Sequence, residues 1–184
     1  MHIFTRRAAL RGTAVASAVA VAVALFPAAL PAAAATGTPI VYQESASATG
    51  TFGGTAFTNA QVTMKMSSNT ADVINQGTGF PQNRTGTVTV SVAGLGAATV
   101  TYGTAYVNQN QALYGTGVFS FNGAGGSNFA MGNKALLSYN LDRPFGPVTG
   151  PSYSNTNRGF QTSNGGLILK SVGTVTFQAF TPQG

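Results

Sequence analysis

The chain has 184 residues, nine of them basic and three acidic, and it contains no cysteine, no tryptophan and a single histidine, His2. Catalytic triads with a histidine base and zinc sites built from histidine and cysteine are therefore excluded from the chain beyond residue 35. Because there is no cysteine to form disulfides, the fold must be stabilised by a hydrophobic core, which a single domain of this length is able to build.

Residues 1–35 have the three parts of a secretory signal peptide. Three arginines precede an apolar run at residues 14–26, and the alanines at residues 32–35 offer small side chains for cleavage before Thr36. The run is shorter than the ~20 residues of a membrane-spanning helix and ends at a proline, so we expect a cleaved leader rather than a membrane anchor. The alanine-rich composition of the leader indicates a bacterial source.

Two adjacent arginines, Arg6 and Arg7, begin a stretch that resembles the twin-arginine export signal. That route carries folded proteins, whereas the general secretory route uses leaders that also often contain paired arginines. Both routes stay open, and both predict a secreted protein, extracellular or periplasmic, with no membrane association once the leader is removed.

After the leader, six basic and three acidic residues remain, and the six basic residues are scattered singly along the chain. Nucleic-acid binders present a basic stripe or patch, so this distribution predicts no nucleic-acid partner. Solubility must then depend on the neutral side chains of Thr, Ser, Asn and Gln, which give an adhesive rather than a repulsive surface.

Apolar and polar residues alternate with a period of two along much of the remaining chain, which predicts β-strands. The predicted strands lie, in chain order, at residues 62–67, 87–92, 98–102, 114–121, 135–141 and 174–179. The alternation is cleanest in residues 87–92, where three valines share one face and hydroxyl side chains the other. Residues 94–96 predict a tight antiparallel connection to the following strand, and Asn122-Gly123 and residues 164–166 predict further turns.

No segment after the leader keeps apolar residues at helical spacing over three turns. Short strands separated by turn residues predict an all-β fold, a single antiparallel β-sandwich of jelly-roll type at residues 36–184, with a closed barrel as the alternative. Residues 76–85 and 144–164 are rich in Gly, Pro and Asn, so we expect both to be surface loops.

Six segments, taken in order, carry a resemblance to known proteins: residues 50–60, 69–73, 87–96, 105–109, 139–150 and 165–177. Together they resemble a group of secreted bacterial β-proteins best known among proteins with a PEP-CTERM sorting tail. The resemblance implies the same all-β fold and an exported location, and it brings no catalytic residues with it. Because the chain stops at Gly184 without a Pro-Glu-Pro motif, an apolar helix and a basic tail, the resemblance implies a freely secreted relative.

The carboxylates after the leader are Glu44, Asp72 and Asp142. A two-carboxylate glycosidase could in principle use a pair of them, but they occur in unrelated sequence settings, and such lone acids more often cap turns or pair with a cation. A calcium site at Asp72 would need several carboxylates, and the adjacent charges of Asp142 and Arg143 are typical of a solvated or structural pair. We therefore predict no catalytic residues, no metal site and no cofactor.

Residues 144–164 contain the best candidates for ligand binding. Phe145, Tyr153 and Phe160 lie there among amides and hydroxyls, and loops on a rigid sandwich often carry binding residues. The alternative is that these aromatic side chains fold back and cover the edge of the core.

Three functions fit the sequence. The first is a non-catalytic structural, surface or extracellular-matrix protein; the second is a glycan-binding sandwich module, whose partner would be an extracellular polysaccharide or another matrix component; the third is an unrecognised hydrolase. Tryptophan, the best platform for stacking a sugar, is absent, but Tyr42 or the three aromatic residues of the 144–164 segment could replace it.

Overall fold

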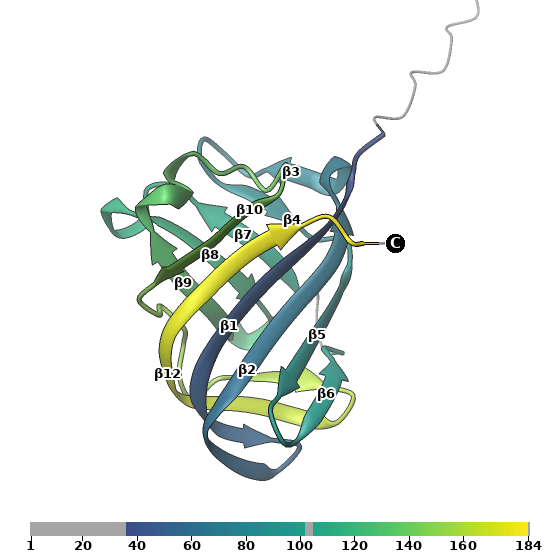
Figure 1. Ribbon diagram of the computed structural model, residues 1–184, viewed down its shortest axis with the longest axis vertical. Helices are drawn as coiled ribbons and strands as arrows, with labels where there is room; N and C mark the ends of the chain where they lie inside the picture. Colours follow the sequence, from purple (N-terminus) through teal and green to yellow (C-terminus); the bar gives the residue numbers. More distant parts are fainter. Residues whose placement is uncertain (1–35, 102–104, 184) are drawn as a thin grey trace, which may run out of the picture. The chain divides into compact units, whose positions relative to one another are not determined.

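The computed structural model describes residues 36–101 and 105–183, and the predicted leader lies outside these residues (Figure 1). The described residues form two antiparallel β-sheets connected by turns and short 3₁₀ helices. None of the helices in these ranges is both long and apolar enough to cross a membrane. The prediction of an all-β, sandwich-like fold is confirmed.

The first sheet has seven strands, and the longest of them curve along its length (Figure 1). Its strands are β1 (Pro39–Phe52), β2 (Thr55–Asn69), β5 (Thr87–Val92), β6 (Gly96–Thr99), β10 (Phe145–Gly150), β11 (Gly159–Thr162) and β12 (Gly165–Phe180). They lie in the order β10-β12-β1-β2-β5-β6, and β11 pairs with β12 as well. The 16 residues of β12 are long enough to pair with β1, β10 and β11.

The second sheet has five shorter strands in the order β3-β4-β7-β8-β9. They are β3 (Val73–Asn75), β4 (Pro81–Asn83), β7 (Tyr106–Asn110), β8 (Gly117–Asn122) and β9 (Asn128–Asn133). The 3₁₀ helices are η1 (Thr70–Asp72), η2 (Leu113–Gly115), η3 (Ala124–Gly126) and η4 (Lys134–Ser138). The turn between β8 and β9 contains η3 and begins at Asn122-Gly123, where the sequence predicted a turn.

The core lies between the inward faces of the two sheets. The three valines of β5 and the apolar residues that alternate along β2 are buried in the first sheet, as the alternation predicted. From the second sheet, Phe119 on β8 stacks on Phe177 of β12 with 3.9 Å between ring centroids. Because successive side chains of a strand point to opposite faces, half of each strand faces outward, and on β7, β8 and β9 these outward residues are mainly polar.

Several predictions of local structure are wrong. Residues 76–85, expected to form a loop, contain β4, which pairs with β3 and β7, and the strand expected at residues 114–121 begins only at Gly117, after η2. Residues 135–141, expected to form a strand, contain most of η4, which begins where the side chain of Asn133 accepts a hydrogen bond from the Ala135 amide at 2.8 Å. Residues 144–164, expected to form a loop, contain β10 and β11. Both are held by pairing with β12, a long-range contact that the composition of residues 144–164 does not reveal.

Further backbone hydrogen bonds cover strands that would otherwise be sheet edges. Residues 99–101, at the end of β6, bond to residues 161–163, with N···O distances of 2.8 and 2.9 Å. Residues 151–153 bond to the outer edge of β9, at 3.2 and 2.9 Å. The second of these connections places the segment after β10 along the outer edge of β9.

Candidate functional site

A hollow of about 300 Å³ lies on the outward face of the second sheet. It is lined by the outward side chains of β7, β8 and β9 together with residues from three connecting segments: Phe80, Asn108, Asn110, Leu113, Tyr114, Val118, Ser120, Asn122, Asn128, Ala130, Tyr153 and Asn155. Strand alternation explains the composition of the floor. On β7 and β8 the side chains of Val107, Phe119 and Phe121 point into the core, so the outward face carries mainly amides and a hydroxyl, with Val118 among them.

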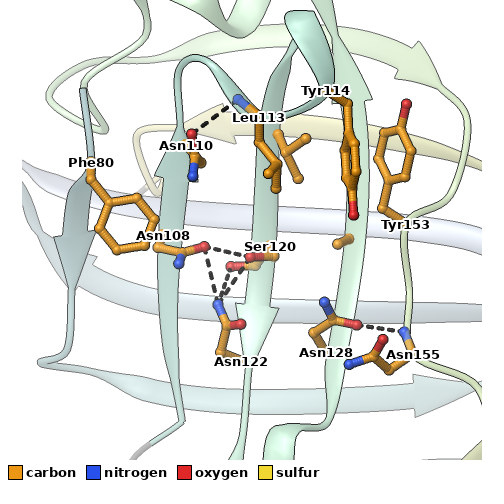
Figure 2. A pocket seen from close by; sticks show the side chains of 12 residues that line it. Phe80, Asn108, Asn110, Leu113, Tyr114, Ser120, Asn122, Asn128, Tyr153 and Asn155 are labelled. Atoms are coloured by element: carbon orange, nitrogen blue, oxygen red, sulfur yellow. Dashed lines mark hydrogen bonds between the residues drawn. The ribbon is translucent and has the colours of Figure 1, made fainter. Parts of the chain in front are cut away.

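The centre of the floor is a hydrogen-bonded group of three side chains (Figure 2). The Oδ1 atom of Asn108 accepts hydrogen bonds from the hydroxyl of Ser120 and from Nδ2 of Asn122, the latter at 3.1 Å. The Asn122 amide also donates to the Ser120 hydroxyl at 2.9 Å. These bonds fix the two amides, while Nδ2 of Asn108 and Oδ1 of Asn122 make no hydrogen bond within the described part of the chain.

Two further asparagines are fixed in the same way at the rim. Oδ1 of Asn110 accepts from the backbone amides of the two residues before Tyr114, at 3.2 and 3.0 Å, and so starts η2. Oδ1 of Asn128 accepts from the backbone amide of Asn155, whose own side-chain amide donates to the carbonyl of Gly126 at 2.8 Å. In both cases the Nδ2 group is left without a partner among the described residues.

An aromatic wall closes one end of the hollow. Tyr114 is 68 % exposed, and its ring stacks on Tyr153 with 4.7 Å between centroids and 24° between planes. Tyr153 is held in turn by the bond from its backbone amide to Ala130 and lies against Gly132, where a Cβ atom would come within 2.4 Å of its ring. Figure 2 shows Phe80 at the opposite end, with the floor between it and Tyr114. Tyr153 therefore covers one face of the Tyr114 ring, and the other face is turned to the hollow.

The backbone of Tyr114 is strained. Its φ of 55° lies in the left-handed region, which costs an L-residue with a bulky side chain roughly 1–2 kcal/mol. Strained residues of this kind occur most often at binding and active sites, where the surrounding structure holds them in place. Here the Asn110 side chain and the Tyr153 ring supply that support.

The residues that line the hollow include no carboxylate, histidine, lysine or arginine. Glu44 lies instead on the inward face of β1 with 0 % of its surface exposed, so it is out of reach of an external substrate. Asp142 and Arg143 form an exposed ion pair at 2.7 Å, and Asp72 lies in η1. In the described residues no three side chains of the metal-binding types come together. Nothing in this arrangement pairs two accessible carboxylates.

The structure does not bring the three predicted ligand-binding residues together. Tyr153 lines the hollow. Phe145 stacks on Tyr139 at 4.5 Å between centroids, and Phe160 is only 2 % exposed, so both cover the core as the alternative had it. Tyr42, named as a further stacking platform, is fully buried, and its hydroxyl donates to the carbonyl of Leu141 at 2.6 Å.

Sequence reasoning missed most of the hollow. The signal that could have found part of the floor is the alternation Phe-Ser-Phe-Asn in residues 119–122; residues 107–110, Val-Asn-Gln-Asn, do not alternate. Tyr114 was placed inside a predicted strand, where its side chain had no special role. Its exposure depends on the left-handed backbone of Tyr114 and on the short η2 turn. Asn110 and Gly115 flank this turn, but a tyrosine gives no sign of a positive φ.

Comparison with known proteins does not identify the chain, because no family, no curated protein and no solved structure matches it. The resemblance to secreted β-proteins with a PEP-CTERM tail therefore stays a prediction, and function has to be argued from the hollow itself.

Proposed function

We propose that the protein is a secreted, non-catalytic glycan-binding module that holds part of an extracellular polysaccharide in the hollow on its second sheet. One observation carries the proposal: an exposed tyrosine ring, supported from behind by a second tyrosine, stands over a floor of fixed amides. A sugar ring has an apolar C–H face and a rim of hydroxyl groups. Aromatic faces pack against the first, and amides, which both donate and accept hydrogen bonds, match the second.

The floor is ordered before any ligand arrives. Asn108, Asn122 and Ser120 bond to one another, and the Asn110 and Asn128 side chains bond to the backbone. Binding therefore does not have to freeze these side chains, which otherwise costs about 0.5–1.5 kcal/mol for each rotamer-rich group. Attachment to a polysaccharide would also give the protein a place in an extracellular matrix, the structural role that was expected first.

Replacement of Tyr114 by glycine tests the proposal. We expect Tyr114→Gly to lose retention on any immobilised polysaccharide that retains the wild type, because the stacking face is gone. Its melting temperature should stay within a few degrees of the wild-type value. Glycine adopts a positive φ without steric cost, so the substitution removes the backbone strain of Tyr114. The stability gained in this way offsets the stability lost with the ring contact to Tyr153, since each is about 1 kcal/mol.

The matched control is Leu137→Ala on η4, which removes another exposed apolar side chain, 43 % exposed, that does not line the hollow. This variant should bind as the wild type does. Undiminished retention of Tyr114→Gly, or a wild type that no polysaccharide retains, would contradict the proposal.

A further inference from the structure

We infer that the hollow selects an uncharged saccharide unit of one or two sugar residues, an inference that rests on the proposed function and specifies its ligand. It follows from three properties of the lining: its lack of charge, its balance of hydrogen-bond donors and acceptors, and its size.

The lining carries no formal charge at neutral pH. It consists of five asparagines, one serine, two tyrosines and four apolar residues. No arginine or lysine lines the hollow: Arg158 donates to the carbonyl of Gly125, and Arg84 donates to the Gln82 side chain and lies over the ring of Tyr106. Proteins bind carboxylate and sulfate groups chiefly through such cations, and an anion moved into an uncharged, partly enclosed site loses hydration that nothing there replaces.

The free hydrogen-bonding groups of the hollow are mixed. Amide nitrogens of Asn108, Asn110 and Asn128 are available as donors, and amide oxygens of Asn122 and Asn155 as acceptors, because no hydrogen bond within the described part of the chain uses them. A sugar hydroxyl donates one hydrogen bond and accepts others, so it can use both kinds of group. A carboxylate only accepts and an ammonium only donates, so either would leave part of the floor unpaired.

The volume limits how much of a polysaccharide is held. About 300 Å³ is at the lower end of the range for small-molecule sites, which fits about one or two sugar rings rather than a long oligosaccharide. Leu113, Val118 and Ala130 add an apolar strip to the lining, against which C–H groups of the sugar can pack.

Retention of the purified protein on two sets of immobilised polysaccharides tests the inference. The neutral set consists of glucan, galactan, mannan and xylan, and the charged set of polygalacturonate, alginate, chondroitin sulfate and chitosan. We expect retention on at least one neutral polymer, unchanged between 0.05 and 0.5 M NaCl because no ion pair is involved, and competition by a neutral disaccharide of the same sugar. Retention on charged polymers alone, weakened by salt, would overturn the inference but leave glycan binding intact. Retention on neither set would overturn both this inference and the proposal that the protein binds a glycan.

Substitutions of asparagine by aspartate connect the result to the hollow. Asn110→Asp and Asn128→Asp keep the oxygen that accepts from the backbone and replace only the free amide nitrogen by a charged acceptor. Each should weaken binding of the retained neutral sugar about threefold to tenfold, the effect of one lost hydrogen bond. Asn69→Asp is the matched control, because Asn69 caps η1 through the same kind of bond, to the Ala71 amide at 2.8 Å, and does not line the hollow. Unchanged binding by both hollow variants, with melting temperatures like the control, would overturn the inference.

Discussion

Glu44 is a carboxylic acid placed in the hydrophobic core. It lies on the inward face of β1, opposite Met64 of β2 and Phe177 of β12, and neither of its oxygens has a hydrogen-bond partner in the described structure. Burial raises the pKa of Glu44 well above its ordinary value of 4.5, because the charged form would lose its hydration with no hydrogen bond to replace it. The core therefore favours the neutral acid.

This raised pKa predicts a protein that is more stable in acid. When the pKa is higher in the folded than in the unfolded state, the stabilisation is complete below the unfolded value and is lost as the pH rises towards the folded value. From about pH 4.5 upward the free energy of unfolding should fall by up to about 1.4 kcal/mol per pH unit until the folded-state pKa is reached. Tyr42 and Tyr139 do not interfere, because burial raises the pKa of both phenols above 10.

Glu44→Gln removes the titrating group and keeps its size. Urea unfolding of both proteins between pH 4.5 and 9 should show a falling stability for the wild type and a much flatter profile for the variant. At pH 8 the variant should be the more stable of the two. Parallel profiles would show that another group causes the pH dependence, and a wild type that gains stability with pH would contradict the assignment.

Strand β5 shows how strongly one element distinguishes its two faces. Val90 is fully buried and lies opposite Met64 and Ala98, whereas its neighbour Thr89 is half-buried and lies opposite Lys65. Val90→Asp should cost several kcal/mol, because it buries an unpaired charge. Thr89→Asp should be mild, since the new carboxylate faces the amine of Lys65 across the strand pair.

Chemical denaturation of these two variants of β5 measures the difference directly. Thr89→Asp should unfold within about 1 kcal/mol of the wild type, the size of a cross-strand pair interaction, while Val90→Asp should fall far below it or fail to fold. Similar losses from both substitutions would mean that the strand does not present the faces described.

The elements that could be predicted from the sequence are those whose own residues show apolar/polar alternation or turn glycines. The Val/Thr alternation of β5 and the alternating apolar residues of β2 and β12 determined which side chains are buried, and the glycine turns were also identified. Strand β10 has the sequence Phe-Gly-Pro-Val-Thr-Gly, which looks like a loop, and it is a strand only because β12 extends far enough to pair with it. The hollow was missed for a similar reason: Tyr114 and Tyr153 are 39 positions apart in the numbering and meet only after β9 and β10 are in place.

At the scale of the whole molecule, the covered sheet edges matter most for a protein with so few charges. Exposed edge strands invite pairing with other chains, and charged residues usually discourage it. Here the end of β6 bonds to residues 161–163 and the outer edge of β9 bonds to residues 151–153. These connections protect two edges by hydrogen bonding where a more charged protein would rely on repulsion, which suits an adhesive surface of amides and hydroxyls.

The proposed role also requires that the chain leave the cell, which gives a prediction for the protein as a whole. Cleavage before Thr36 would leave the first strand complete, because β1 begins at Pro39. It would also keep Thr38, whose backbone amide donates to the hydroxyl of Thr70 at 2.9 Å and whose carbonyl accepts from the Thr70 amide at 3.0 Å. We therefore expect the intact mass of the protein from culture supernatant to match a chain that starts at Thr36.

A double variant, Arg6→Lys with Arg7→Lys, separates the two export routes. It should abolish secretion if the twin-arginine route carries the protein, and leave secretion unchanged if the general route does, because the general route requires only positive charge. In both cases the secreted wild-type protein begins at the same residue. A cell-associated species that keeps its first 35 residues would show that this segment is not a cleaved leader. The protein would then not be freely secreted, and the proposal that it binds an extracellular polysaccharide as a secreted protein would fail.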